Sequence, residues 1–254
     1  EALLKRADML KCEYIATGHY AKIRKEDDRY IVSKGLDSNK DQSYVLWGVT
    51  QECLKRTIFP MGKYHKSEIK QMAIDRGYIQ LAEKSESYEI CFIPDNDYRS
   101  FLKRKVKGLE EKVSGGNFLS TDGKILGVHK GYPFYTIGQR KGIKVSDKEP
   151  LYVLKIDSVK NEIIVGPRNE LGKKIISLNN INLLVDKKEF DDKIFVKVRS
   201  TGKLLDAKIN IKDKNKANVD LAIPEDGISP GQACVFYSKD NFGHKVLGGG
   251  WIDT

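Results

Sequence analysis

The chain has 254 residues, a length that predicts one to three domains, each able to bury its own core without disulfide bonds. Hydrophobic residues make up 40% of the sequence and aromatic residues 9%, which is typical of a folded protein and excludes a disordered one. The 45 basic and 35 acidic residues leave a formal net charge of +10. No apolar run approaches the roughly 20 residues that cross a bilayer, and no signal peptide is seen, so we expect a cytoplasmic protein without a membrane partner.

The excess positive charge is concentrated in one fifth of the chain. The net charge is +1 over residues 1–100, +6 over residues 101–150 and +3 over residues 151–254. The densest runs are Phe101–Lys107 and Gly138–Gly142. Lysine and arginine next to glycine can follow a phosphate backbone, which favours a nucleic-acid partner. The same residues also suit a solvated helix face, so charge alone leaves both interpretations open.

The first hundred residues predict an α/β arrangement. Residues 1–11 have apolar side chains at helical spacing, and Tyr14–Thr17 is typical of a short buried strand. Residues 21–32 predict a hairpin around a polar turn, and Lys66–Arg76 predicts an amphipathic helix that ends at Gly77. A helix followed by a strand indicates part of a parallel sheet, and ligands of such sheets collect at the carboxyl ends of the strands.

The rest of the chain predicts a basic, loop-rich middle region and then β structure. A helix is expected from about Asp97 to Lys107, followed by many glycines over residues 114–143. From Leu151 onward eight short strands follow at close spacing, which is typical of a small barrel or sandwich. We therefore expect an α/β domain over residues 1–90, a small basic central domain over 91–150 and a β-barrel over 151–254.

The four cysteines fit neither a zinc cluster nor a secreted disulfide framework. Cys12, Cys53, Cys91 and Cys234 lie 41, 38 and 143 residues apart. The sequence favours a buried structural thiol at each position, because free cysteine is among the most buried residue types. Cys91 also precedes Pro94 at a strand end in a basic neighbourhood, where a reactive thiolate is the alternative. A redox role is disfavoured because the sequence has no C-x-x-C pair.

Several polar residues stand at positions suited to a ligand. His19 follows Gly18 at the end of the first strand, where a backbone N–H and an imidazole can both reach a cleft. Asp41 precedes an apolar run and can either cap a helix or contact RNA. Arg199 ends a strand and Gln232 lies in a turn, positions compatible with a polyanion site and equally with ordinary surface. The glycine run at 248–250 lacks the spacing of a phosphate loop and predicts a closely packed strand.

Seven motifs in one order resemble the tRNA-specific 2-thiouridylase family, known as MnmA in bacteria. They begin with the ATGHYA, KDQSY and QECLKRTIFP segments, continue with EICFIPDNDY and YTIGQRKG, and end with VGP and PGQ. Colinear strings of this length are much more specific than any single short motif. They begin at Ala16 and end at Gln232, so the resemblance covers nearly the whole chain.

The resemblance implies a fold, a reaction and a set of site residues. The implied fold is an ATP pyrophosphatase-type α/β domain, a small central domain and a C-terminal β-barrel. The implied reaction activates C2 of the wobble uridine in the tRNA anticodon stem-loop with ATP, with Mg²⁺ accompanying it, and a cysteine persulfide charged by an upstream sulfur-donor protein then supplies sulfur. Cys91 matches the persulfide carrier and Gly18 a position that contacts ATP. The positions that match tRNA contacts are His19, Lys40, Asp41, Gln42, Arg199, Ser200 and Gln232.

Two departures from the family pattern limit what the chain is expected to do alone. The Ser-Gly-Gly-x-Asp-Ser phosphate loop and the first catalytic cysteine are absent from the sequence. Because the chain opens without Met and in an apparent helix, we expect a fragment that binds tRNA without thiolating it. A smaller departure is Ser200, followed by Thr201 where many relatives have an aromatic residue. The alternative function is a noncatalytic RNA-binding module in which Cys91 is structural.

Overall fold

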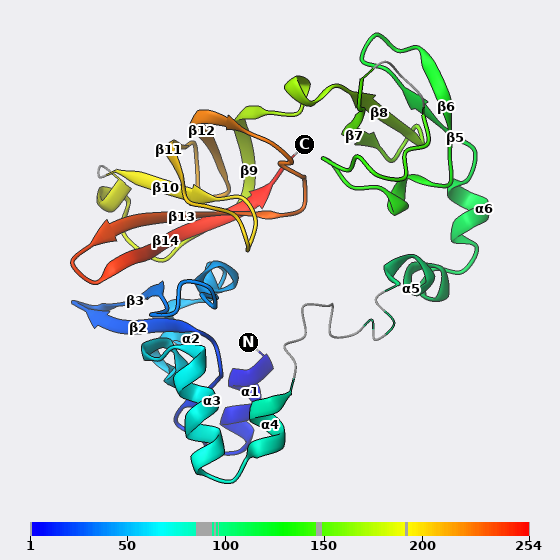
Figure 1. The fold of residues 1–254 in the computed structure, drawn as a ribbon. Coiled ribbons are helices and arrows are strands. Elements are labelled where there is room, and N and C mark those ends of the chain that lie inside the picture. Colours follow the sequence, from blue (N-terminus) through cyan, green and yellow to red (C-terminus); the bar gives the residue numbers. More distant parts are fainter. Residues whose placement is uncertain are drawn as a thin grey trace. The chain divides into compact units, whose positions relative to one another are not determined.

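The computed structural model describes residues 2–84, 93, 95, 97–145, 149–190 and 193–253, without the side chain of residue 187. The described chain divides into two compact units (Figure 1). The first unit contains residues 1–84, 174–223 and 230–254, and the second contains residues 85–173 and 224–229. Segments from the two ends of the sequence therefore fold together. No helix in the described ranges is long and apolar enough to cross a membrane.

The first unit begins with a small α/β arrangement. Two short strands, β1 (Ile15–Ala16) and β4 (Thr57–Ile58), pair in parallel, which confirms the predicted parallel pairing. Around them lie the α-helices α1 (Ala2–Met9), α2 (Gln51–Lys55), α3 (Lys66–Asp75) and α4 (Ile79–Glu83), with the 3₁₀ helices η1 (Ser43–Leu46) and η2 (Pro60–Lys63). Helix α3 ends where Gly77 adopts a φ of 81°, as the sequence predicts.

The rest of the first unit is a closed barrel of six antiparallel strands. Its strand order is β13-β10-β11-β12-β9-β14, and pairing of β13 with β14 closes it. The strands are β9 (Lys173–Leu183), β10 (Ile194–Lys197), β11 (Leu205–Ile211), β12 (Lys216–Glu225), β13 (Ala233–Asp240) and β14 (Gly243–Ile252), and η5 (Lys187–Phe190) follows β9. Valines and leucines that alternate with exposed residues, such as Val219 and Leu221 on β12, fill its interior.

A hairpin from the N-terminal region extends the barrel sheet. Strands β2 (Ala21–Glu26) and β3 (Arg29–Lys34) pair with each other, and β3 pairs with β14 where Ser33 lies opposite Lys245. The hairpin and the barrel share one hydrophobic core, whose buried members include Ala21, Val32, Leu54, Val235 and Val246. We expected the N-terminal region and the barrel to be separate domains, but the two have a common core.

The glycine run of β14 allows a close approach to Trp47, which follows η1. A Cβ atom at Gly249 would lie 3.0 Å from the Trp47 ring and 2.8 Å from the Cys234 carbonyl oxygen. Gly248 has a φ of 147°, and a Cβ atom there would lie 2.2 Å from the Asn182 carbonyl oxygen. The predicted closely packed strand is confirmed, because side chains at these positions would displace either the tryptophan or the neighbouring strand.

The second unit holds a four-stranded sheet of order β6-β5-β8-β7. Its strands are β5 (Gly116–Leu119), β6 (Ile125–His129), β7 (Tyr152–Asp157) and β8 (Glu162–Gly166), and its helical segments are α5 (Tyr98–Lys105), α6 (Leu109–Val113), η3 (Tyr132–Phe134) and η4 (Arg168–Glu170). Phe118, Ile143, Val153, Ile163 and Val165 form its core.

Strands β7 and β8 correct the expected grouping of all strands after Leu151 into one barrel. They pair with β5 of the second unit instead, through the parallel register of Phe118 with Ile163. Alternating apolar residues predict that a segment forms a strand, but they do not select its partner, because many apolar strands satisfy the same alternation. The pairing was decided by packing against Phe118, which no local pattern in residues 151–166 reveals.

Candidate nucleic-acid interface

The carboxyl end of β1 presents an open glycine beside a fixed histidine. The Thr17 amide donates to the Ile58 carbonyl oxygen, which continues the parallel pairing up to Gly18. Gly18 is exposed, and a Cβ atom there would meet nothing within 4 Å. The His19 Nδ1 atom lies 2.8 Å from the Thr17 hydroxyl, and its ring centroid lies 5.6 Å from that of Phe59. The main chain at Gly18 is therefore open to a ligand, while the imidazole beside it is held in place.

Asp41 is a buried carboxylate that organises the loop between β3 and η1. Its side chain is only 2% exposed. Oδ1 accepts from the amides of Gly35 and Ser43, both at 3.1 Å, and Oδ2 accepts from the Ser43 hydroxyl at 3.1 Å. The Lys34 ammonium lies 4.0 Å from Oδ2. The carboxylate accepts from the amide of Ser43, the first residue of η1, although the N-cap position of that helix is Gln42.

Gln42 joins this loop to the segment that follows His19. The Gln42 amide donates to the Tyr20 carbonyl oxygen at 3.0 Å, and the Tyr20 amide donates to Gln42 Oε1 at 3.1 Å. The Lys40 amide donates to the Asp37 carbonyl oxygen at 3.1 Å, and Lys40 is half-buried. The two hydrogen bonds between Gln42 and Tyr20 thus bring the KDQ segment close to the end of β1, although 20 positions or more separate the two segments in the sequence.

Lys197 connects η1 to the turn after β10. Its ammonium donates to the Ser200 carbonyl oxygen at 2.6 Å and lies 5.9 Å from the centroid of the Tyr44 ring. Burial lowers the pKa of Lys197, and the Asp41 carboxylate partly opposes that shift. Arg199 and Ser200 are half-buried and exposed, respectively, and the Gly202 amide donates to the Arg199 carbonyl oxygen at 3.0 Å. Lys197 therefore links the Ser200 carbonyl oxygen to Tyr44, which lies in η1 just after the Asp41 loop.

Gln232 lies at the end of the same network. The Tyr44 hydroxyl donates to the carbonyl oxygen of Ala233, the next residue, at 2.7 Å, and burial raises the pKa of Tyr44 to about 12. The Ile252 amide donates to the Gln232 carbonyl oxygen at 2.7 Å, and the residue itself is exposed. The hydroxyls of Ser43 and Tyr237, 3.2 Å apart, add a second link between η1 and the barrel.

The sequence did not indicate the buried residues that connect the segments resembling tRNA-contacting stretches. Lys197 donates to the Ser200 carbonyl oxygen and lies over the Tyr44 ring, and the Tyr44 hydroxyl donates to the Ala233 carbonyl oxygen, so these two residues join the KDQ loop to the barrel. One signal for Lys197 was available, because this lysine, the last residue of β10, stands between two buried valines, Val196 and Val198. A cation inside an apolar strand indicates a buried partner.

The thiol nominated for catalysis, Cys91, lies outside the described residues. Among the described cysteines, Cys234 is buried, and that burial raises its thiol pKa. Cys53 is half-buried, whereas Cys12 is exposed, so the expectation of a buried thiol is wrong for Cys12. Cys12 follows α1, where its Sγ atom lies 3.7 Å from the Leu10 carbonyl oxygen. In the described ranges, no group of three or more His, Cys, Asp or Glu side chains could hold a metal ion.

The basic helix of the second unit is partly neutralised. On α5, Lys103 forms an ion pair with Glu110 at 2.5 Å, and Arg104 forms one with Asp95 at 3.3 Å. Lys105 lies over the Phe101 ring at 5.9 Å and is exposed, as is Lys107. Lys105 and Lys107 therefore form no ion pair with any described carboxylate, and the usable positive charge is smaller than the count along the sequence suggests.

Comparison with known proteins accounts for all three regions. Residues 1–95 match the family model described as tRNA methyl transferase HUP domain. Residues 99–167 match a tRNA methyl transferase PRC-barrel domain, and residues 173–252 match an Aminomethyltransferase beta-barrel domain. These matches agree with an α/β region, a middle β unit and the closed barrel of Figure 1.

Relatives with a common name match the chain from end to end. A tRNA-specific 2-thiouridylase MnmA of Cytophaga hutchinsonii is 44% identical over 100% of this chain and 68% of its own length. The chain belongs to the tRNA-specific 2-thiouridylase MnmA family. MnmA proteins of Amoebophilus asiaticus and Salinibacter ruber are 48% and 50% identical, each over 99% of this chain. The chain spans 66% of the length of these two MnmA relatives.

Proposed function

We propose that this chain acts in ATP-dependent transfer of sulfur to C2 of the wobble uridine of tRNA. The observation that supports the proposal is a buried network. The Lys197 ammonium donates to the Ser200 carbonyl oxygen and lies over the Tyr44 ring, and Asp41 binds the neighbouring Ser43. This network links two segments that are about 160 residues apart and that resemble tRNA-contacting stretches. The names of the relatives, tRNA-specific 2-thiouridylases, point in the same direction.

In tRNA recognition, the exposed and the buried residues would have different roles. Lys40, Arg199 and Gln232 would contact the phosphates and the anticodon stem-loop, since cations and amides suit the RNA backbone and unstacked bases. Asp41 and Gln42 would act by shaping the loop, because both carry hydrogen bonds to backbone amides. His19 would lie nearest to the reacting nucleotide, because Thr17 and Phe59 orient its ring beside Gly18.

The chemical step needs an activated oxygen and a nucleophilic sulfur. Transfer of AMP from ATP, accompanied by Mg²⁺, to O2 of the uridine would release pyrophosphate and convert O2 into a leaving group. The open space at Gly18 fits an approach of the nucleotide to the main chain. The terminal sulfur of a persulfide on Cys91 would attack C2 while AMP leaves with the former O2 atom. A second thiolate would then attack Sγ of Cys91, which leaves the outer sulfur on the base and forms a disulfide with Cys91 that a thiol reductant must reduce before the next cycle.

Two further partners follow from this chemistry. Cys91 loses its outer sulfur in each cycle, so an upstream protein must donate sulfur to it again. The tRNA substrate implies a cytoplasmic location. Both inferences rest on the reaction proposed here.

Binding of RNA by the chain itself tests the recognition step. The double replacement of Lys40 and Arg199 by alanine is expected to weaken binding of an unmodified tRNA transcript by about tenfold or more. The loss of even one hydrogen bond to a charged group costs roughly 1.5–3 kcal/mol. A matched control, Lys212→Ala with Lys214→Ala in the β11–β12 turn, removes the same charge from an exposed site elsewhere. Equal losses in both double variants would contradict a specific interface.

Replacement of Cys91 tests the chemical step in the native protein. Cys91→Ser is expected to abolish formation of 2-thiouridine, measured by mass spectrometry of digested tRNA, because serine cannot carry a persulfide. The affinity for tRNA should stay nearly unchanged, which a filter-binding titration measures. Continued thiolation by this variant would refute the role of Cys91.

A further inference from the structure

A pocket of about 440 Å³ lies beside the end of β1, on the side where the hairpin meets η2. Its walls are Lys22, Ile23, Arg24, Ser33, Ile58, Phe59, Pro60, Lys63 and Phe242. The volume is in the lower part of the range of about 300–1,000 Å³ that small-molecule sites occupy. These walls include three cations and no carboxylate, and two of the remaining side chains are phenyl rings.

The two lysines of this pocket are brought together by a close backbone contact. A Cβ atom at Gly62 would lie 1.8 Å from the Ala21 carbonyl oxygen and 3.2 Å from Cγ of Lys22. Only glycine allows η2 to approach β2 this closely, and the approach puts Lys63 at the same pocket as Lys22. Within the part of the chain that the structure describes, neither lysine forms an ion pair, so both charges are available to an anion.

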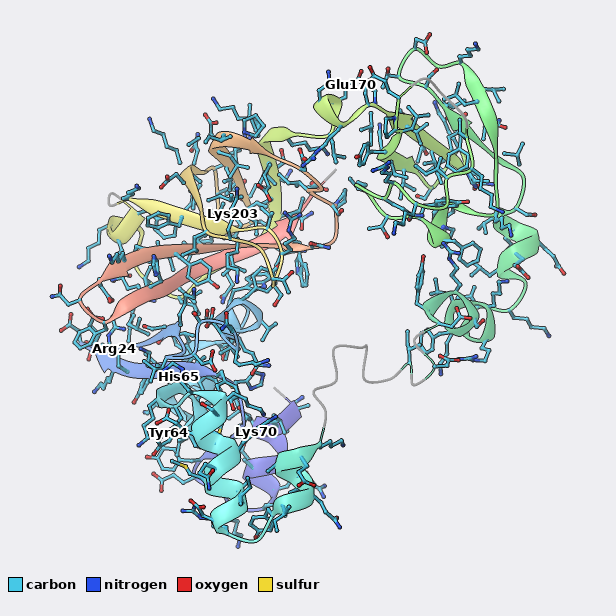
Figure 2. All side chains as sticks on the ribbon, viewed as in Figure 1. Arg24, Tyr64, His65, Lys70, Glu170 and Lys203 are labelled. Carbon is cyan, nitrogen blue, oxygen red and sulfur yellow. The ribbon has the colours of Figure 1, made fainter. Side chains whose placement is uncertain are left out.

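Arg24 has a different role, since its charge is already balanced. Its guanidinium donates to the carboxylates of Glu26 and Asp240 and, at 2.6 Å, to the Ser33 hydroxyl. These partners hold Arg24, which Figure 2 labels, against Phe242, and the Phe242 ring centroid is 4.8 Å from the guanidinium carbon. Phe242 lies in the β13–β14 turn and is 66% exposed. The guanidinium therefore fixes an exposed aromatic ring at the rim of the pocket.

Exposed apolar groups complete a surface on which a flat base can stack. Ile58 is 48% exposed at the end of β4, and Pro60 is exposed next to it. An aromatic ring and apolar groups that line the same pocket as two lysines match the chemistry of a nucleotide, whose base stacks and whose phosphate is an anion. Phe59 connects the pocket with the candidate interface, because its ring also contacts His19.

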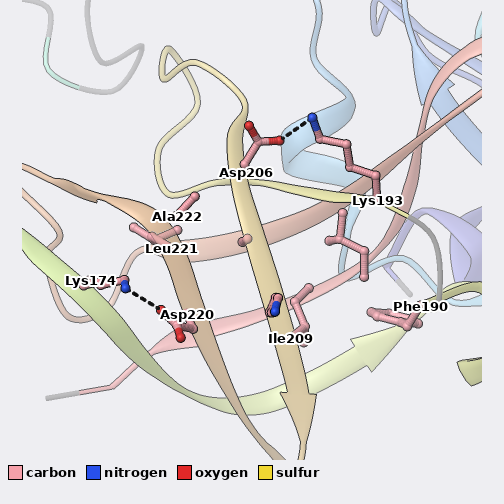
Figure 3. Close-up of a pocket in the computed structure, with 11 residues that line it drawn as sticks. Lys174, Phe190, Lys193, Asp206, Ile209, Asp220, Leu221 and Ala222 are labelled. Atoms are coloured by element: carbon pink, nitrogen blue, oxygen red, sulfur yellow. Dashed lines mark ion pairs between the residues drawn. The ribbon is translucent and has the colours of Figure 1, made fainter.

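A larger pocket on the barrel lacks this chemistry. It has a volume of about 740 Å³ and is lined by residues of β9, β10, β11 and β12 (Figure 3). Two of its lysines already have carboxylate partners, because Lys174 lies 3.9 Å from Asp220 and Lys193 lies 3.1 Å from Asp206. An anion entering there would have to compete with these carboxylates, whereas Lys22 and Lys63 of the smaller pocket form no ion pair with any carboxylate that the structure describes.

We propose that the pocket between β2, η2 and Phe242 binds one nucleotide of the RNA strand, next to the nucleotide that reaches His19. Lys22 and Lys63 contact its phosphate, and Phe242 stacks on its base. This inference rests on the proposed function, since it extends the same RNA path by one nucleotide. The same chemistry would suit a free nucleotide such as ATP, and the experiment separates these two sources.

Photocrosslinking tests the position of the base. An anticodon stem-loop RNA carries 5-bromouridine at one loop position at a time, and crosslinked peptides of the 254-residue chain are mapped by mass spectrometry. We expect one position adjacent to the wobble nucleotide to crosslink to Phe242 or Phe59. Excess ATP should leave this crosslink unchanged. Loss of the crosslink in ATP, or its absence at every position, would overturn the proposal.

Substitution at the pocket tests its contribution to affinity. Lys22→Ala with Lys63→Ala should weaken binding of the stem-loop RNA about tenfold and reduce the log–log salt slope by about 1.4, at about 0.7 per contact to single-stranded RNA. Phe242→Ala should weaken binding about fivefold or more without loss of folding, because the ring is largely exposed. The control is again Lys212→Ala with Lys214→Ala.

The two proposals fail in different ways. If the pocket variants bind like wild type while Lys40→Ala with Arg199→Ala binds weakly, the pocket has no role and the proposed function stands. If the wild-type chain itself does not bind the stem-loop RNA, the proposed function fails first.

Discussion

At the scale of single residues, buried polar groups hold the candidate interface in shape. Asp41 accepts three hydrogen bonds at a position that is 2% exposed, and Lys197 lies close enough for the carboxylate to affect its pKa. A buried acceptor with three donors cannot be removed without leaving those donors unpaired. The first consequence of changing Asp41 should therefore be loss of loop structure, with RNA binding lost as a result.

Two substitutions of Asp41, to alanine and to asparagine, should lower the free energy of unfolding by different amounts. Asp41→Ala should lower the free energy of unfolding by about 2–4 kcal/mol, because two amides and a hydroxyl lose their acceptor and the Lys34 ammonium loses its carboxylate partner. Asp41→Asn should cost less, since its Oδ1 can still accept from the amides of Gly35 and Ser43. Urea titration followed by the fluorescence of Trp47 and Trp251, which both lie in the first unit, measures this. Equal stability of Asp41→Ala and wild type would show that the loop does not depend on the carboxylate.

At the scale of elements, two glycines with opposite surroundings make a matched pair. A Cβ atom at Gly62 would overlap the Ala21 carbonyl oxygen at 1.8 Å, whereas one at Gly18 would meet nothing within 4 Å. Gly62→Ala should lower the unfolding free energy by about 1–3 kcal/mol, the usual cost of overpacking, and Gly18→Ala should leave it within about 0.5 kcal/mol of wild type. Thermal unfolding of both variants checks this, and a stable Gly62→Ala protein would contradict the close contact of η2 with β2.

The sheet of the second unit contains a buried histidine that links stability to pH. His129 accepts from the Gly131 amide through Nδ1 at 3.0 Å, and its Nε2 lies 3.2 Å from the Asn161 carbonyl oxygen. Burial lowers the pKa of His129, while the hydrogen bond to Asn161 partly opposes this. The folded state thus holds the neutral ring, and the unfolded state protonates near pH 6.5.

The direction of the pH effect follows from these two states. The stability that neutral His129 contributes is complete above about pH 6.5 and decreases as the pH falls below that value, because protons bind the unfolded chain more tightly. Hydrogen exchange of amides in β5 and β6 at pH 7.5 and pH 5.5 measures the change. His129→Asn should show a smaller decrease between these pH values than wild type, and an identical decrease would exclude His129 as the cause.

At the scale of the whole molecule, the net charge of +10 overstates what an RNA can use. Lys103 and Arg104 have carboxylate partners, while Lys105 and Lys107 form no ion pair with any described carboxylate. Binding of tRNA should weaken steeply as salt increases, since each phosphate contact releases counterions. Lys105→Ala with Lys107→Ala should reduce the log–log slope by about 1.4–1.8, and Lys103→Ala should change it less. Filter binding between about 50 and 200 mM salt, a range over which affinity for nucleic acid changes steeply, measures the slope for both variants.

The sequence alone determined the element types, the family and most candidate residues. Local periodicity was sufficient for α3, the β2–β3 hairpin and the barrel strands, because the repeat of buried positions is a property of neighbouring residues. The long colinear motifs indicated the family without any knowledge of contacts. The closely packed glycines at 248–250 could also be interpreted locally, since the absence of side chains suits a close approach of another chain segment.

Only the tertiary structure decided how these parts combine. Pairing of β3 with β14 put the first and last segments into one core, and pairing of β5 with β8 moved β7 and β8 into the second unit. Strand partners are chosen by complementary packing between distant residues, and alternation within a strand carries no information about that choice. For the same reason the sequence could indicate that Lys197 is buried but not which residues it contacts. Its role depends on Tyr44 and Ser200, which only folding brings to one buried ammonium group.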